Sequence, residues 1–156
     1  MKITILNISN KMPIWVETAC DDYLQRINRG KYQCKIIEIK SPKAPNKPVS
    51  QIKSDEATKF AEYIPRDAFV IMLDERGVDF GSLKLAAKLD SISLTNSHIC
   101  FIIGGADGLD DQFKTRANML IKLSSLTFPH ALVRVILLEQ IYRVISILEN
   151  HPYHRE

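Results

Sequence analysis

The stretch Leu123-Ser124-Ser125-Leu126-Thr127-Phe128-Pro129-His130 separates a short apolar run, Met119 to Leu123, from the longest apolar segment of the chain. The short run predicts a strand. Pro129 suits the first position of a helix, where a missing N–H has no intrahelical partner to lose. We therefore expect the stretch to be a loop that follows a strand and stops abruptly at a helix N-terminus.

The helix expected from His130 to about Asn150 is apolar on nearly every side. Its apolar positions are Leu132, Val133, Val135, Ile136, Leu137, Leu138, Ile141, Val144, Ile145, Ile147 and Leu148. A helix of this kind is buried on more than one side, but two arginines, a glutamate and a glutamine interrupt it too often for a membrane span. We expect one side to pack on a sheet and another on a partner subunit.

Upstream of this loop, strand patterns alternate with helix patterns. The expected strands are Lys2 to Ile8, Cys34 to Ile39, Ala68 to Leu73, His98 to Ile103 and Met119 to Leu123, and the expected helices begin at Pro13, near Ser50, at Ser82 as the capping residue, near Asp110 and at Pro129. The third strand is expected to end at Asp74-Glu75-Arg76-Gly77. The continuous apolar runs indicate parallel strands covered on both faces. The fold class is therefore α/β, a single domain over residues 1–156 with a mainly parallel sheet flanked by helices.

Composition is that of an ordinary globular protein, with 46% hydrophobic and 25% charged residues in a chain of 156. The formal net charge of +3 permits a phosphate-rich partner without requiring one. Cys20, Cys34 and Cys100 are odd in number and lie in apolar runs, which favours reduced core thiols over a disulfide framework or a zinc site. The N-terminus lacks the apolar region of an export signal. We expect a cytoplasmic protein with no membrane segment and no metal.

A basic stretch rich in proline runs from Lys40 to Lys53. Its three prolines exclude regular structure over the first half, and its lysines have no acids near them in the sequence. One interpretation is a solvated surface loop. The other is a set of phosphate contacts by Lys40, Lys43 and Lys47, which would position a nucleic-acid backbone without reading its sequence.

Ligands of open α/β sheets bind at the carboxyl ends of the strands. Three strand ends are candidates here: Leu73, Gly104-Gly105 and Leu123-Ser124. The glycines of Gly104-Gly105-Ala106-Asp107-Gly108 let the backbone turn tightly and approach a ligand. Their spacing is not that of the dinucleotide fingerprint, and the chain has no phosphate-binding Walker sequence. The segment is therefore either a ligand wall or a plain turn between strand and helix.

The C-terminal tail, His151-Pro152-Tyr153-His154-Arg155-Glu156, is crowded with aromatic and cationic groups, where most chains end in indifferent polar residues. Tyrosine and histidine can stack on a nucleobase while arginine holds a phosphate or an anionic ring. The alternatives are a disordered end and a metal site formed by His151 and His154. Pro152 argues against the metal site, because it prevents a regular helix from presenting the two histidines as ligands. Arg143 is a further candidate for substrate recognition. The other interpretation of Arg143 is an i,i+4 ion pair with Glu139 on the helix surface.

Four segments together resemble the RlmH family of SPOUT methyltransferases. They are Ile102 to Gly108, Leu123 to His130, Leu132 to Val135 and Asn150 to Glu156, and the similarity extends over the whole chain, including Lys11-Met12-Pro13. The resemblance implies an S-adenosylmethionine-dependent enzyme that methylates N3 of a pseudouridine in the helix 69 loop of bacterial 23S rRNA in the large ribosomal subunit. It also implies a homodimer, no metal, and a trefoil knot in the C-terminal half, about residues 98–150.

The same resemblance assigns roles to residues of this chain. The cofactor pocket is expected from Leu73, Gly104, Gly105, Ser124, Ser125, Leu126, Thr127, Phe128 and Pro129, and recognition and activation of the pseudouridine from Arg143, Tyr153, His154 and Arg155. Some family members have a proline after the loop histidine where this chain has Ala131. That departure concerns the rigidity of the helix more than the chemistry.

Methyl transfer to N3 requires in-line positioning and loss of the N3 proton. His154 accepting the proton through a water, and Arg143 with Arg155 stabilising the imide anion, both remain open. A branched side chain at Gly105 is expected to enter space that belongs to the ligand. Two other functions also remain open: a SPOUT methyltransferase acting on tRNA, and a non-catalytic ribosome-binding factor.

Overall fold

The computed structural model describes residues 1–9, 11–42 and 44–155. Five strands form one sheet in the order β2-β1-β4-β3-β5, and every described pair of neighbours is parallel. The strands are β1 (Lys2–Ser9), β2 (Gln33–Lys40), β3 (Phe69–Asp79), β4 (His98–Ile103) and β5 (Met119–Lys122), and the helices are α1 (Ile14–Ile27), α2 (Val49–Tyr63), α3 (Ser82–Ser93), α4 (Asp111–Lys114) and α5 (His130–Leu148). The predicted α/β class with a parallel sheet is confirmed.

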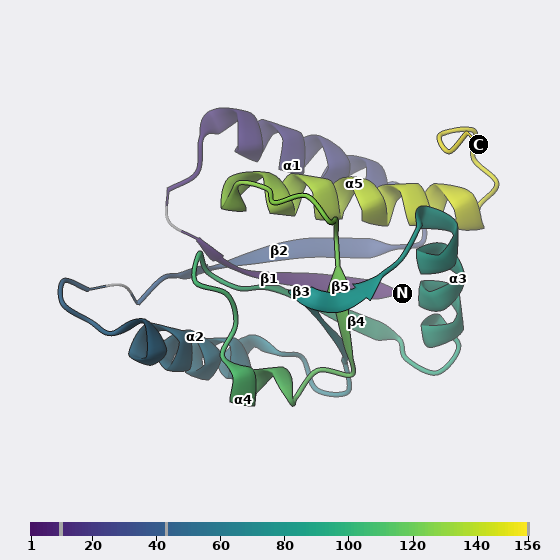
Figure 1. Ribbon diagram of the computed structural model, residues 1–156. Coiled ribbons are helices and arrows are strands. Elements are labelled where there is room, and N and C mark those ends of the chain that lie inside the picture. Colours follow the sequence, from purple (N-terminus) through teal and green to yellow (C-terminus); the bar gives the residue numbers. More distant parts are fainter. Residues whose placement is uncertain (10, 43, 156) are drawn as a thin grey trace.

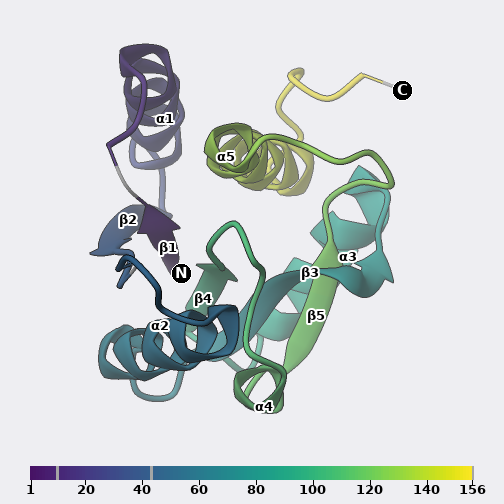
Figure 2. The same ribbon diagram turned by 60° about the vertical axis from the view of Figure 1, so that its left-hand side comes forward.

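Helices cover both faces of the sheet (Figure 1). The face under α1, α3 and α5 is filled by Ile5, Ile71 and Phe101 from the strands. The opposite face packs on α2 and α4, where Phe60 and Phe113 stack with ring centroids 5.7 Å apart. Figure 2 shows the same layers from another side. Continuous apolar runs are therefore needed in the strands, as the sequence predicted.

Prolines mark the starts of three helices. Pro13, Pro48 and Pro129 each occupy the capping position, with φ near −59° at the first two and −55° at the third. Pro129 thus lies one residue before the helix rather than at its first position. Ser82 was wrongly expected to cap its helix: Gly81 holds that position, and the Ser82 hydroxyl instead donates to Gln140 Oε1 of α5 at 2.9 Å.

The third strand is longer than predicted. It was expected to end at Asp74, but β3 continues to Asp79 and pairs again with β5 after an irregularity between Leu73 and Val78. Gly77 makes this second pairing possible, because an added Cβ would lie 2.5 Å from the Ile121 carbonyl carbon. The polar sequence of this extension hid it, since its side chains are largely exposed while the backbone pairs.

The expectation that the basic stretch has no acids near its lysines is wrong in three dimensions. Lys47 forms an ion pair with Asp55 of α2 and also donates to the Pro42 carbonyl at 3.3 Å. Lys40 belongs to β2, and Lys43 lies outside the described residues. The observed pairing favours the surface-loop interpretation for Lys47.

The three cysteines are buried and free, as expected. Burial raises the pKa of Cys20 to about 11 and the pKa values of Cys34 and Cys100 to about 12. All three thiols are therefore protonated at neutral pH and inert. Within the described residues, no helix is long and apolar enough to cross a membrane.

Candidate active site

A cavity of about 600 Å³ opens at the carboxyl ends of β4 and β5 and beside the irregular part of β3 that follows Leu73. Its apolar walls come from Leu73, Ile103, Leu123, Leu126, Phe128 and Val133. Its polar lining comes from Lys53, Asp74, Glu75, Arg76, Asp107, Asp111, Lys114, Lys122, Ser124 and His130. All three positions chosen from the sequence thus meet at one cavity, although Leu73 lies at the irregularity inside β3 and not at its end.

The glycine segment between β4 and α4 forms one wall of this cavity. A Cβ added to Gly104 would lie 2.9 Å from the Leu109 side chain, and one added to Gly105 would lie 2.6 Å from Glu56 Oε1. Glu56 is a buried carboxylate of α2 that accepts a hydrogen bond from Ser41 at 3.3 Å. The expectation that a side chain at Gly105 would enter the space of a ligand is therefore incomplete. A side chain there would first collide with the buried carboxylate on which the loop rests.

An ion-pair cluster forms part of the cavity lining. Lys114 Nζ of α4 lies 2.7 Å from Asp74 Oδ2 at the turn of β3 and 2.9 Å from Asp111 Oδ1. Burial alone would raise the pKa of Asp74, but hydrogen bonds from Lys114 and from the Arg76 N–H lower it below its ordinary value. The two carboxylates raise the pKa of Lys114. The sequence did not reveal this cluster, because Asp74 is far from Lys114 and Asp111 along the chain and meets them only in the folded protein.

The loop before α5 contributes some of its predicted residues to the cavity and not others. Ser124, Leu126 and Phe128 line it. Ser125 instead donates to Asp79 Oδ2 at 3.4 Å, Thr127 is exposed, and Pro129 caps α5. The last three are absent from the described lining, although their backbone shapes the loop that carries the others.

Two contacts fix the first turns of α5 to the sheet. His130, which lines the cavity, has Nε2 2.7 Å from the Ile8 carbonyl oxygen. Arg134 is 2% exposed and forms an ion pair with Glu38 of β2. From the sequence Arg134 seemed only to interrupt an apolar helix. The structure instead shows it as a buried anchor: Arg134 holds the start of α5 against β2, while His130 holds it against β1.

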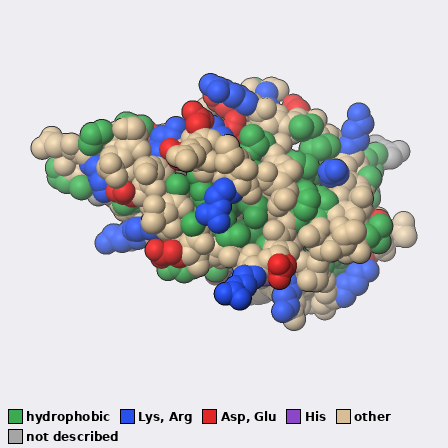
Figure 3. Space-filling view, turned by 90° about the horizontal axis from the view of Figure 1, so that it is seen from below, with side chains coloured by type: hydrophobic (Ala, Val, Ile, Leu, Met, Phe, Trp, Pro, Cys, Tyr) green, Lys and Arg blue, Asp and Glu red, His purple; other side chains and the backbone are tan. Residues whose placement is uncertain are grey.

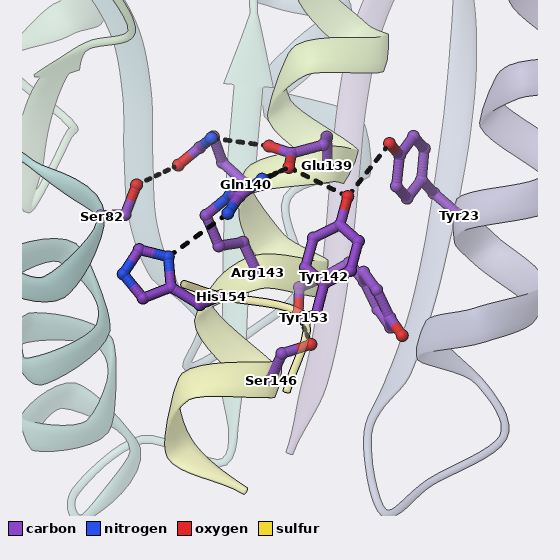
Figure 4. Close-up of polar contacts among 9 residues, drawn as sticks. All are labelled: Tyr23, Ser82, Glu139, Gln140, Tyr142, Arg143, Ser146, Tyr153 and His154. Atoms are coloured by element: carbon purple, nitrogen blue, oxygen red, sulfur yellow. Dashed lines mark hydrogen bonds and ion pairs between the residues drawn. The ribbon is translucent and has the colours of Figure 1, made fainter. Parts of the chain in front are cut away.

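At the other end of α5, the C-terminal tail folds back on the helix around Glu139 (Figure 4). Glu139 Oε1 accepts from Arg143 Nε at 3.0 Å, from Arg143 Nη2, and from the Tyr153 hydroxyl at 3.2 Å. Glu139 Oε2 accepts from Gln140 Nε2 at 2.6 Å. Arg143 Nη1 in turn lies 3.3 Å from His154 Nδ1. The i,i+4 pair and the site role of Arg143 are therefore not alternatives, because the pair aims the guanidinium at the tail.

Aromatic rings complete this tail cluster. The Tyr153 ring meets the Tyr142 ring edge-on, with centroids 4.7 Å apart, and lies 4.9 Å from Arg143 Cζ. Burial, the Tyr23 hydroxyl and Glu139 together raise the pKa of Tyr153, so its phenol stays protonated. Three of the four predicted recognition residues thus lie together. Arg155 is exposed and outside the cluster, and Glu156 lies outside the described residues.

The tail cluster and the cavity of one chain are far apart. His130 and Arg143 are separated by about 20 Å along α5, at the helical rise of 1.5 Å per residue. In Figure 1 the tail leaves one end of α5 while the cavity loop enters the other. Between them runs a partly exposed face of the helix, formed by Leu132, Val135, Ile136, Glu139, Tyr142 and Arg143. The structure therefore leaves the predicted cofactor and substrate residues in two separate groups.

The face of the molecule that carries α2 and α4 has mixed surface charge. On the side of α2 and α4, Lys and Arg side chains are scattered among acidic and apolar ones (Figure 3). Among the described residues no group of three or more His, Cys, Asp or Glu side chains is arranged to hold a metal ion. The cavity and the tail cluster therefore remain the features on which a function can be argued.

Comparisons with known proteins agree with this arrangement. Residues 1–154 match the model of a family described as predicted SPOUT methyltransferases. Proteins named ribosomal RNA large subunit methyltransferase H are 46% identical in Neisseria gonorrhoeae and 47% in Neisseria meningitidis, over all of both chains, and 42% identical in Paraburkholderia xenovorans over 99% of each. A tRNA (m1G37) methyltransferase structure from Aquifex aeolicus has the same fold, with a TM-score of 0.58 at 17% identity, over 100% of this chain and 76% of that one. The chain thus belongs to the SPOUT methyltransferase family.

Proposed function

We propose that this protein transfers the methyl group of S-adenosylmethionine to N3 of a pseudouridine in the helix 69 loop of 23S rRNA, within the large subunit or the assembled ribosome in the cytoplasm. The observation that carries the proposal is the cavity beside β3, β4 and β5, in a chain that matches large-subunit rRNA methyltransferases over their full length. The trefoil knot expected over about residues 98–150 and the single domain remain predictions.

The cavity suits S-adenosylmethionine in size and chemistry. Its volume of about 600 Å³ falls in the range typical of small-molecule sites. Leu126 and Phe128 offer apolar surfaces for an adenine ring, and the glycine segment keeps side chains away from that wall. The lining mixes acidic and basic groups, which matches a ligand with a sulfonium, an amino group and a carboxylate. We assign the adenosyl and methionine parts to Leu73, Gly104, Gly105 and the loop from Ser124 to Pro129.

A homodimer would bring the two separated groups of residues together. The partly exposed face of α5 is apolar at Leu132, Val135 and Ile136, and Ile14 and Trp15 of α1 are 80% and 55% exposed. A second copy packed on this face about a two-fold axis, with the helices antiparallel, would set its tail cluster beside the cavity of the first. Each active site would then consist of one subunit's cavity and the other's Arg143, Tyr153, His154 and Arg155.

In such a site the protein acts mainly by positioning and by electrostatics. S-adenosylmethionine supplies, when bound, an electrophilic methyl group on a sulfonium. The Tyr153 ring offers a stacking surface for the target base. Arg143 is a permanent cation, because the Glu139 hydrogen bond raises its pKa, and it can stabilise negative charge on the imide as N3 loses its proton.

Incubation of the purified protein with S-adenosylmethionine carrying a labelled methyl group tests the proposal. Large subunits or ribosomes from a strain lacking the gene are expected to accept the label, and unfractionated tRNA is not. Labelling of tRNA alone would show the other methyltransferase function. Absence of cofactor binding in calorimetry would show a non-catalytic ribosome-binding factor. Leu126→Asp, in an exposed cavity wall, serves as a folded control expected to lose cofactor binding.

Mixed dimers test whether the site is composite. Leu126→Asp protein with an intact tail is re-dimerised with protein truncated after Pro152. If tails act across the interface, random pairing restores about a quarter of the wild-type sites. If each tail serves its own subunit, the mixture stays as inactive as either parent, and the composite site must be abandoned.

A further inference from the structure

The tail cluster selects one tautomer of the His154 ring. Arg143 Nη1 lies 3.3 Å from His154 Nδ1. A guanidinium has N–H donors only and no acceptor, so Nδ1 must offer its lone pair to this contact. A neutral imidazole with a lone pair on Nδ1 carries its proton on Nε2. The ring therefore turns an N–H, and not a basic nitrogen, away from Arg143.

A chain of hydrogen bonds leads to the contact between Arg143 and His154, and in each of them the donor and the acceptor are defined. Ser82 donates to Gln140 Oε1 at 2.9 Å, and Gln140 donates to Glu139 Oε2 at 2.6 Å. Arg143 donates to Glu139 through Nε and Nη2, which leaves Nη1 for His154. The Tyr153 ring, 4.9 Å from Arg143 Cζ, further limits rotation of the guanidinium. The chain of bonds from α3 through α5 thus ends at one histidine nitrogen.

We infer that His154 is a hydrogen-bond donor to the target base and not the acceptor of its N3 proton; this inference rests on the proposed function. The lone pair of Nδ1 already accepts an N–H of Arg143, so it is not free to take the N3 proton. Nε2 already holds a proton. The Nε2–H can instead donate to a carbonyl oxygen beside N3, where negative charge develops.

The transfer balances without a protein base. The N3–H bond breaks and its proton passes to solvent water or hydroxide. The N3 lone pair then forms the N–CH₃ bond while the S–CH₃ bond of the sulfonium breaks and leaves its electron pair on sulfur. The titratable and charged groups that contact His154 directly or through this cluster are Arg143 and Glu139 of α5, Tyr153 of the tail, and Tyr23 of α1, whose hydroxyl lies 3.5 Å from the Tyr153 hydroxyl.

Nitrogen NMR of protein labelled in its histidines tests the tautomer directly. At neutral pH the His154 signals, identified by their loss in His154→Gln, are expected to show a protonated Nε2 and a lone pair on Nδ1. Arg143→Met, which removes the donor, is expected to abolish this preference. A proton on Nδ1 in the wild-type protein would overturn the inference, and this measurement needs neither methyl transfer nor RNA.

Single-turnover methyl transfer then tests the role. His154→Gln retains an N–H donor near the Nε2 position but no base, and is expected to stay within about tenfold of the wild-type rate. His154→Phe has no donor and is expected to lose about 10²- to 10³-fold. A glutamine variant as slow as the phenylalanine variant would overturn the donor role. If the wild-type protein methylates no pseudouridine at all, the proposed function fails while the tautomer result stands.

Discussion

Replacing Lys114 with methionine should destabilise the protein by breaking an ion pair in the lining of the cavity. Lys114→Met removes the cation from Asp74, whose side chain is 8% exposed, while the apolar stem of the side chain is kept. Breaking a buried ion pair on one side costs about 3–5 kcal/mol, and we expect the lower limit, because the Arg76 N–H still donates to Asp74 Oδ1 at 2.9 Å. Asp74→Asn should cost less, about 1–2 kcal/mol, since Lys114 retains Asp111.

Urea unfolding of the two single variants and the double variant measures the coupling. The double variant should be more stable than the sum of the single losses by about 1.5–2 kcal/mol, because no buried charge is left without its partner. Asp111→Asn is the matched control, since that side chain is 82% exposed and should cost under about 0.5 kcal/mol. Single losses that add to within about 0.5 kcal/mol would refute the argument.

Two further predictions concern pH and the glycine wall. Folding lowers the pKa of Asp74, so this carboxylate stabilises the protein above its unfolded pKa, and the stabilisation is lost as pH falls through the lower folded pKa. The difference in free energy of unfolding between wild type and Lys114→Met should therefore shrink below about pH 4. Gly105→Ala should lower the free energy of unfolding by about 1–3 kcal/mol, because the new Cβ meets Glu56. Gly30→Ala, with nothing within 4 Å of the new Cβ, should change it little, and equal thermal midpoints for the two alanine variants would contradict the clash.

The sequence predicted the fold well where burial decided the structure. The apolar run His98–Ile103 was correctly predicted as a buried strand, and Pro13 and Pro129 correctly marked the starts of α1 and α5. The prediction from sequence failed where a strand is held by main-chain hydrogen bonds while its side chains stay exposed. The extension of β3 pairs Val78 and Asp79 with β5 through the main chain while both side chains remain exposed, so no apolar pattern records it.

The location of the candidate site could be predicted from the sequence, but most of the contacts within it could not. Strand ends and glycines located the cavity, because parallel strands bring their carboxyl ends to one edge. The pairing of Lys114 with Asp74 and the burial of Arg134 against Glu38 depend on tertiary packing, which no local spacing encodes. Glu139 was visible only as a helical partner of Arg143, whereas the structure makes it the acceptor that organises the tail.

Mass mapping of helix 69 tests the central claim most directly. The 23S rRNA of a strain lacking the gene is digested, and the helix 69 fragment is compared with that of the parent and of strains carrying wild-type protein or Leu126→Asp from a plasmid. We predict one methyl group on the pseudouridine in the parent and the wild-type complement, and its absence in the deletion and the Leu126→Asp strain. A fragment that keeps its methyl group in the deletion strain would contradict the proposed function.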